Sequence, residues 1–147
     1  EGTGASLVPG WAGNPKSGGT TVPIARLDTL VQPPKPGETT FFLIDVEGHE
    51  HAALTGAKGL ITAEQKPVWM VEVSNTIHQP TGSASNPDYA ATLALFRDAG
   101  YQAISTSQGF RTVPWDDAIG GFDGVEGENF VFCAPDAAPR VLSARQD

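Results

Sequence analysis

Positive charge is scarce in this sequence. The chain has 9 Lys and Arg residues against 17 Asp and Glu residues, a formal net charge of −8 at pH 7. Nucleic acids are bound mainly through clustered Lys and Arg that neutralise phosphates. We therefore expect no nucleic-acid partner.

Cysteine and long apolar runs are scarce as well. Cys133 is the single cysteine, which excludes a disulfide framework and a zinc site built from several cysteines. Apolar runs such as Phe41-Phe42-Leu43-Ile44 are far too short to cross a bilayer, so we expect no membrane partner. The chain opens without a basic stretch followed by an apolar one, the pattern of an export signal. We therefore predict a cytoplasmic location.

The material for one packed domain is present. The chain has 147 residues, of which 39% are hydrophobic, enough for a single core. Residues 1–21 are rich in glycine and are expected to form an irregular lead-in. The domain is expected over residues 22–135, with a tail over residues 136–147.

Apolar patterning predicts an α/β domain. Residues 39–46 form a continuous β-rich apolar run, which is typical of a strand buried on both faces in a parallel sheet. Residues 49–61 then carry apolar side chains at helical spacing. We expect a mostly parallel sheet with one antiparallel edge strand and with helices packed on it. The remaining predicted elements are strands at 22–27, 67–73, 102–107 and 129–134, a helical turn at 28–31, a helix from Asn86 to Gly100, and a glycine- and acid-rich loop before the last strand.

Acidic residues follow two of the predicted buried strands. Asp45 and Glu47 end the first strand, and their spacing of two puts both side chains on one face while the strand continues. Gly48 allows a sharp turn and the close approach of a ligand. Glu72 lies near the end of the next strand. Since ligands of parallel sheets bind beyond the carboxyl ends of the strands, these residues form the candidate site, which could supply a base, a hydrogen-bond acceptor or a cation site.

Structural roles compete with each functional one. Glu50 can serve as an ordinary partner of a helix dipole, and Glu72 can form a buried ion pair with Arg26 or Arg97. His49 and His51 are two residues apart on a predicted helix, which points them in different directions and argues against a shared zinc site. We therefore predict no metal site.

Several segments together resemble a known family. The sequence resembles FkbM-type S-adenosylmethionine-dependent methyltransferases in the order of five segments. These segments are RLDTL, FFLIDVEGHEHAALTGAKGLI, PVWMVEVS, DAGY and ENFVFCAP. The D-x-E-G-x-E motif of Asp45 to Glu50, followed by L-x-G-A, is the most specific part. The resemblance implies the second half of a Rossmann-like methyltransferase sheet, and Asp28 matches the acidic position of the family's L-D element.

The resemblance also implies an activity and a set of site residues. The activity would be methyl transfer from S-adenosylmethionine to a hydroxyl oxygen of a sugar or other small metabolite. Asp45 would orient or deprotonate the acceptor, with Glu72 and His49 as second choices. A divalent cation held by Asp45, Glu47 and Glu72 is a weaker alternative. The predicted cofactor-binding residues are Asp45, Val46, Glu47 and Gly48, and the predicted substrate-binding residues are Glu50, Asn75 and His78.

One part of the family pattern is missing. The glycine-rich turn that binds the cofactor after the first strand has no counterpart upstream of Val22. We therefore expect the chain to be a C-terminal portion of the enzyme that binds S-adenosylmethionine weakly or not at all. Such a portion would expose an apolar sheet edge and could self-associate there.

Two alternative functions remain open at the level of sequence. The first is a metal-dependent phosphoesterase or exonuclease that uses the carboxylates of Asp45 and Glu47. The second is a non-catalytic half-domain that completes its sheet with a partner.

Overall fold

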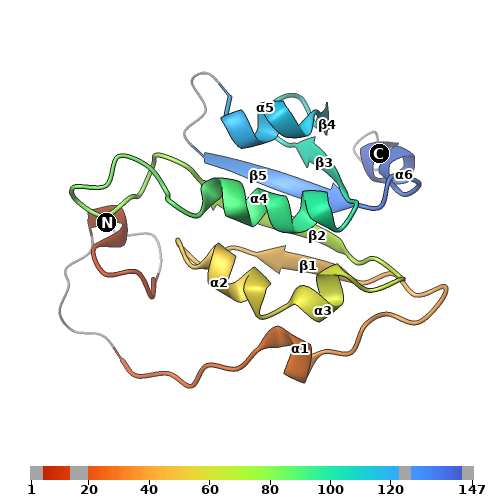
Figure 1. Ribbon diagram of the computed structural model, residues 1–147, viewed down its shortest axis with the longest axis horizontal. Helices are drawn as coiled ribbons and strands as arrows, with labels where there is room; N and C mark the ends of the chain where they lie inside the picture. The colour runs from red at the N-terminus through yellow and green to blue at the C-terminus, as the bar shows by residue number, and fades with distance from the viewer. Residues whose placement is uncertain (1–4, 14–19, 123–126, 144–147) are drawn as a thin grey trace.

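The computed structural model describes residues 5–13, 20–122 and 127–143. Within these ranges lies a sheet flanked by short helices (Figure 1). No helix among the described residues is long and apolar enough to span a membrane. In chain order the elements are a 3-10 helix (Trp11–Gly13), α1 (Leu27–Leu30), β1 (Phe41–Ile44), α2 (Glu50–Thr55), α3 (Lys58–Ile61), β2 (Val68–Ser74), α4 (Tyr89–Asp98), β3 (Gln102–Ser105), β4 (Arg111–Val113), α5 (Trp115–Gly120), β5 (Gly127–Cys133) and α6 (Ala138–Ser143).

The strands lie in the order β1-β2-β5-β3-β4. Only β1 and β2 pair in parallel, because β5 runs antiparallel to both of its neighbours and β4 forms a hairpin with β3. The α/β class is confirmed, but a mostly parallel sheet is not. The antiparallel strand expected at an edge is β5, and it lies in the centre. Strand β5 runs back along the sheet without a crossover helix. It can therefore insert between β2 and β3, which run in the same direction as each other.

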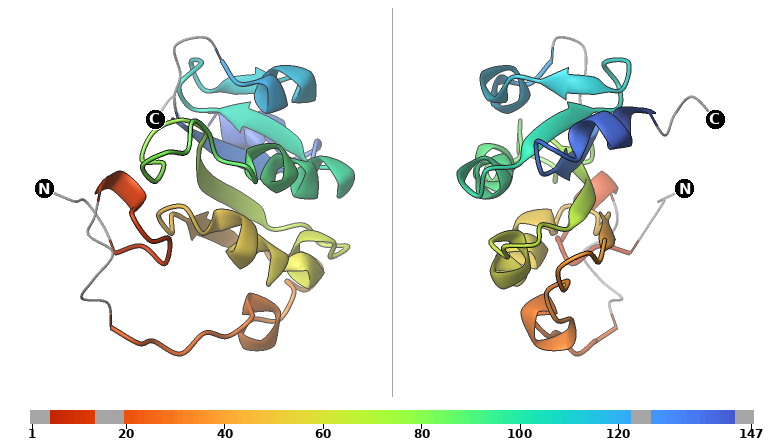
Figure 2. Two further views of the ribbon diagram at one scale, coloured as in Figure 1. Left: turned by 60° about the vertical axis from the view of Figure 1, so that its left-hand side comes forward. Right: turned by 90° about the vertical axis from the view of Figure 1, so that its right-hand side faces the viewer.

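Helices cover the two faces of the sheet unequally. Helices α2 to α5 lie on one face and α6 lies on the other, as Figure 2 shows when the sheet is seen from its side. The first face carries the main core, in which Phe96 of α4 stacks on Phe132 of β5 with ring centroids 3.9 Å apart. Phe42 of β1 stacks on Trp69 of β2 at 4.3 Å. On the second face, α6 covers Ile104, Val131 and Cys133.

The β2–α4 unit follows its sequence pattern closely. Strand β2 was expected at 67–73 and spans Val68–Ser74. The helix expected from Asn86 to Gly100 is α4, which spans Tyr89–Asp98, and Gly100 follows it with a φ of +76° that suits glycine. The Gly100 N–H donates to Arg97 O and the Tyr101 N–H donates to Phe96 O, which closes the last turn in a Schellman arrangement.

Other predicted elements need correction. Residues 22–27 form no strand, since the chain is irregular until α1, where the predicted helical turn is found. The helix expected over residues 49–61 is broken at Gly56 into α2 and α3. The loop expected before the last strand contains β4 and α5, and the tail contains α6. These elements have three to six residues, too few for their periodicity to be recognised.

Strand β1 is not buried on both faces. Its side chains alternate, with Phe41 57% and Leu43 62% exposed, because β1 is an edge strand and its second face has no helix over it. The opposite edge strand, β4, carries the exposed Arg111. Charged residues commonly protect strand edges from pairing, and β1 has none. The apolar edge expected from the sequence is therefore present.

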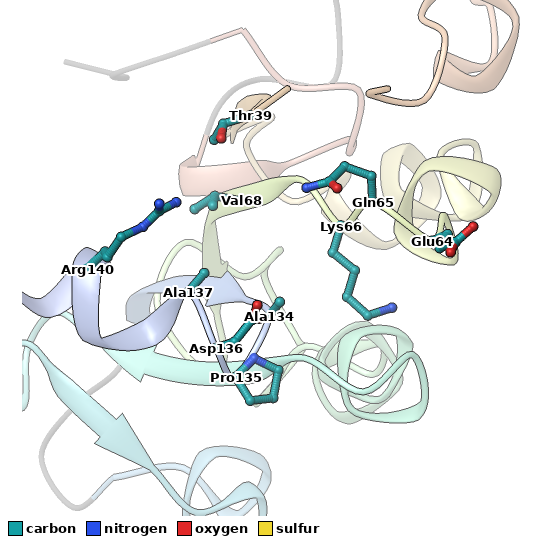
Figure 3. A pocket seen from close by; sticks show the side chains of 10 residues that line it. All are labelled: Thr39, Glu64, Gln65, Lys66, Val68, Ala134, Pro135, Asp136, Ala137 and Arg140. Atoms are coloured by element: carbon teal, nitrogen blue, oxygen red, sulfur yellow. The ribbon is translucent and has the colours of Figure 1, made fainter. Parts of the chain in front are cut away.

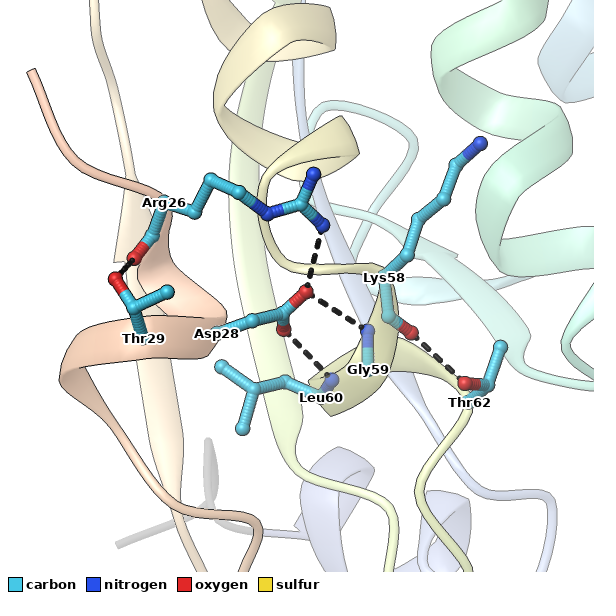
Figure 4. Close-up of polar contacts among 7 residues, drawn as sticks. All are labelled: Arg26, Asp28, Thr29, Lys58, Gly59, Leu60 and Thr62. Carbon is cyan, nitrogen blue, oxygen red and sulfur yellow. Dashed lines mark hydrogen bonds and ion pairs between the residues drawn. The ribbon is translucent and has the colours of Figure 1, made fainter.

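Asp28 anchors α1 to α3 (Figure 4). Its two carboxylate oxygens accept hydrogen bonds from the N–H groups of Gly59 and Leu60, each at 3.2 Å. These are the second and third residues of α3, whose amides have no partner within the helix. The acidic residue of the L-D element thus caps a helix that lies 30 residues further along the chain.

Candidate active site

The candidate site lies at the carboxyl ends of β1 and β2. The register pairs Ile44 with Val71 in parallel, so the next residues, Asp45 and Glu72, face each other on neighbouring strands. Both project to the second face of the sheet, the one that α6 covers elsewhere. Their carboxyl groups are hydrogen-bonded to each other. The structure therefore brings together the two acidic residues that the sequence placed at neighbouring strand ends.

The surroundings of Glu72 favour its protonated form. Partial burial removes water from its carboxyl group, and the hydrogen-bonded carboxyl of Asp45 lies beside it. Glu47 and Glu50 add negative charge nearby. Together these effects raise the pKa of Glu72 above its ordinary value. Ser74 Oγ lies 3.5 Å from Glu72 Oε1, at the limit of a hydrogen bond. The ion pair of Glu72 with Arg26 or Arg97 is not formed, because these arginines pair with Asp28 and Asp98.

The other two acids of the motif have structural partners. Glu50 is 5% exposed, and its Oε1 accepts hydrogen bonds from the N–H groups of Val46 and Gly48 at 3.2 and 3.0 Å. Glu47 Oε2 accepts a hydrogen bond from the Trp11 indole N–H at 2.9 Å. Asp45 is therefore the carboxyl group of the motif whose partner is another acid, Glu72.

The remaining predicted residues lie in the segments that follow β1 and β2 along the chain. His49 precedes α2 as its N-cap residue and makes no side-chain cap hydrogen bond. His51 Nδ1 lies 3.3 Å from Thr92 Oγ1 of α4. Asn75 follows β2, and its carbonyl accepts a hydrogen bond from Asn86 N–H. His78 is exposed, and its ring packs edge-on against Trp11 at 6.0 Å.

Sequence reasoning missed Asn129. The register of β2 and β5 pairs Glu72 with Asn129, which puts the amide beside the acid pair on the same face. The preceding register rows on that face are apolar, such as Leu43, Met70 and Val131. The polar row of Asp45, Glu72 and Asn129 thus begins beyond the part of the sheet that α6 covers. Only the strand order could have revealed this, because β5 was expected at the edge.

A separate hollow lies at the opposite end of the sheet (Figure 3). It has a volume of about 500 Å³ and is bounded by residues that precede β1 and β2 and residues that follow β5. Lys66 and Arg140 line it together with Glu64 and Asp136, so its charges balance. None of the predicted site residues belongs to it.

Among the described residues, no group of three or more His, Cys, Asp or Glu side chains is arranged to hold a metal ion. The carboxyl groups of Asp45, Glu47, Glu50 and Glu72 make this end of the sheet acidic.

Comparison with known families agrees with this geometry. A family model described as the methyltransferase FkbM domain matches residues 5–103, which is more than half of the chain. Comparison with curated proteins and with solved structures gives no match. The matched span includes β1, β2 and the acidic motif between Asp45 and Glu50. The chain belongs to the FkbM methyltransferase family.

Proposed function

We propose that this chain carries the acceptor site of an S-adenosylmethionine-dependent methyltransferase that acts on a hydroxyl group of a sugar or another small metabolite. The observation that supports this proposal is the hydrogen-bonded carboxyl pair of Asp45 and Glu72 at the ends of two parallel strands. A carboxylate is a hydrogen-bond acceptor for a hydroxyl group and can take its proton. The family match favours methyl transfer over the phosphoesterase alternative.

The two acids have different roles in this proposal. Glu72, whose pKa is raised, is the hydrogen-bonding partner that holds Asp45 in place. Asp45 accepts the hydrogen bond of the acceptor hydroxyl. Asp45 would take the proton of that hydroxyl. S-adenosylmethionine, when bound, would supply the methyl group, with its sulfonium as the leaving group.

The side-chain amide of Asn129 adds a further hydrogen-bonding group next to the acid pair. An amide offers both a donor and an acceptor, so it can bind a second oxygen of the acceptor molecule. Because Asn129 lies in the register row of Glu72, two neighbouring hydroxyl groups could be bound along that row. This arrangement supports an acceptor with several hydroxyl groups, such as a sugar.

Methyl transfer from isotopically labelled S-adenosylmethionine to a panel of sugars and polyols tests the proposal, with the protein at its full natural length. Asp45→Asn is expected to lower the rate by about 10²- to 10⁴-fold, the usual contribution of a general base. Asp136→Asn is the matched control, because Asp136 lies in the hollow at the other end of the sheet and should leave the rate unchanged. Equal rates for Asp45→Asn and wild type would refute the role of Asp45.

The edge of β1 favours a second candidate role, in which two copies of the chain pair through β1. Phe41 and Leu43 are exposed on a strand without charged residues. Sedimentation over a range of protein concentrations should then show a dimer, and Leu43→Lys should abolish it. Ala90→Lys, an exposed substitution on α4 with the same change of charge, is the control. A monomer at all concentrations would exclude this role.

A further inference from the structure

Trp11 is buried although its surroundings in the sequence are mostly small and polar. Its side chain is 4% exposed, and it lies over the turn that follows β1. Its indole N–H donates to Glu47 Oε2 at 2.9 Å. Its ring lies so close to Gly48 that a Cβ atom there would be 2.5 Å from two ring carbons. Glycine is therefore required at position 48 to admit the indole.

The segment around Trp11 also reaches the loop that follows β2. The Ala12 N–H donates to the His78 carbonyl at 2.8 Å, and the Trp11 and His78 rings are in edge-to-face contact. The Ser6 hydroxyl donates to the Glu47 carbonyl. Residues 6–13, which we call the clamp segment, thus connect the loop after Asp45 with the loop after Glu72. Figure 1 shows this segment at the end of the sheet where β1 and β2 finish.

Backbone strain gathers at the same place. The structure describes four non-glycine residues with positive φ, and three of them are Ala12, Glu47 and His78, at +48°, +52° and +62°. Such conformations are unfavourable for residues with a Cβ and persist only where surrounding contacts impose them. Here the contacts are those of the clamp segment, so the strained turn and loop depend on it.

We propose that Trp11 is a positioning residue that holds the turn after β1 against the loop after β2 and so sets the spacing of the Asp45 and Glu72 carboxyl groups. The role in methyl transfer rests on the function proposed above, whereas the spacing of the two acids can be tested without it. Trp11 acts on the pair through Glu47 and Gly48, which lie two and three residues beyond Asp45. The family match begins at residue 5, so it includes the clamp segment.

The same contacts determine the charge around Glu72. The groups that face Glu72 are the carboxyls of Asp45, Glu47 and Glu50 and the hydroxyl of Ser74. Trp11 fixes the carboxylate of Glu47 among them. Loss of the indole N–H should let Glu47 turn to solvent and let the two strand ends separate, so that Glu72 titrates nearer to its ordinary value.

The test follows the titration of the Glu72 carboxyl by NMR in wild type and in Trp11→Phe, which keeps an aromatic ring but removes the N–H donor. The pKa of Glu72 is expected to fall in Trp11→Phe. In the methyl-transfer assay, kcat should fall about tenfold with a smaller change in KM. Trp115→Phe is the control, because Trp115 stacks on Phe132 in the core and should change neither reading.

A second variant keeps the test decisive if Trp11→Phe does not fold. Ser6→Ala removes only the hydroxyl that holds the Glu47 carbonyl and should shift the Glu72 titration in the same direction by a smaller amount. If Glu72 titrates as in wild type in the folded variants, the clamp is refuted. If the wild-type protein transfers no methyl group, the proposed function fails, and the titration alone still decides whether Trp11 positions the acid pair.

Discussion

Asp45 and Glu72 are neighbours because β1 and β2 run in parallel with Ile44 opposite Val71. The next position of each strand carries an acid, and the two carboxyl groups share a hydrogen bond. Two carboxyl groups that share a hydrogen bond cannot both ionise without repulsion. The site therefore retains a destabilising feature at neutral pH, which is common where residues are arranged for chemistry rather than for stability.

Glu72→Gln should stabilise the protein at neutral pH. The pKa of Glu72 is raised in the fold, so ionisation of Glu72 favours the unfolded chain, and stability falls as pH rises from the ordinary value of 4.5 through the raised one. Glutamine removes this loss. Thermal unfolding should show a higher midpoint for Glu72→Gln at pH 7 and similar midpoints below pH 4.5. A difference of 1 kcal/mol moves the midpoint by about 2–4 °C in a domain of this size, which is easily measured.

The control for that experiment is Glu64→Gln, since Glu64 is exposed at the other end of the sheet. Its midpoint should follow wild type at each pH. A lower midpoint for Glu72→Gln at pH 7 would contradict the raised pKa.

Asp28→Ala should destabilise the protein by about 1 to 2 kcal/mol, the usual cost of losing a helix cap. Burial opposes ionisation of Asp28, but hydrogen bonds from Gly59, Leu60 and Arg26 outweigh it and lower its pKa. This stabilisation is therefore complete above the ordinary value of 3.8 and is lost as pH falls through the lowered pKa. Urea unfolding at pH 7 and at pH 3 measures both effects.

Asp98→Ala serves as the comparison for Asp28. Asp98 is an exposed aspartate whose partner is Arg97 next to it, and exposed pairs contribute little. Its removal should change stability by less than about 0.5 kcal/mol. An equal effect of the two substitutions would mean that Asp28 does not act as a cap.

Cys133 should resist thiol reagents in the folded protein. Burial, with a smaller effect of the Asp136 carboxylate, raises the pKa of the thiol from 9.0 to about 11. At pH 8 the thiolate fraction is then about 100-fold below that of an ordinary cysteine, and the sulfur is fully covered. Alkylation with iodoacetamide should be slow until denaturant is added. Rapid alkylation of the native protein would show that the second face of the sheet opens readily.

Asn129→Ala should raise KM for the hydroxyl acceptor about tenfold while kcat changes less, since it removes hydrogen bonds to the acceptor rather than the proton acceptor. Gln102→Ala is the control, because Gln102 lies on β3, next to β5, and pairs with Cys133 at the other end of β5. A fall in kcat without a change in KM would instead place Asn129 in the chemical step.

The features that could be predicted from sequence were local ones. The β2–α4 unit followed from an apolar run, an amphipathic period and Gly100, all of which act within a few residues. The acidic strand ends of Asp45 and Glu72 were visible for the same reason. Their direct contact depended on two strands pairing in parallel, and the sequence pattern suggested this pairing correctly.

The features that escaped prediction depend on residues far apart in the chain. Trp11 is buried by Glu47 and Gly48, which lie 36 and 37 residues away, and its own neighbourhood gives no sign of a partner. Asn129 joins the site only because β5 inserts beside β2. The alternate exposure of β1 reflects its edge position rather than its composition.

The place of β5 has a consequence for how the protein folds. This strand is the last of the described sheet in sequence but the third in space, and it provides the contact between β2 on one side and β3 on the other. During synthesis, the β1–β2–α4 portion and the β3–β4 hairpin must therefore wait for residues 127–133 to leave the ribosome before they can join. Pairings between distant segments slow folding, so the final, rate-limiting event should be insertion of this strand.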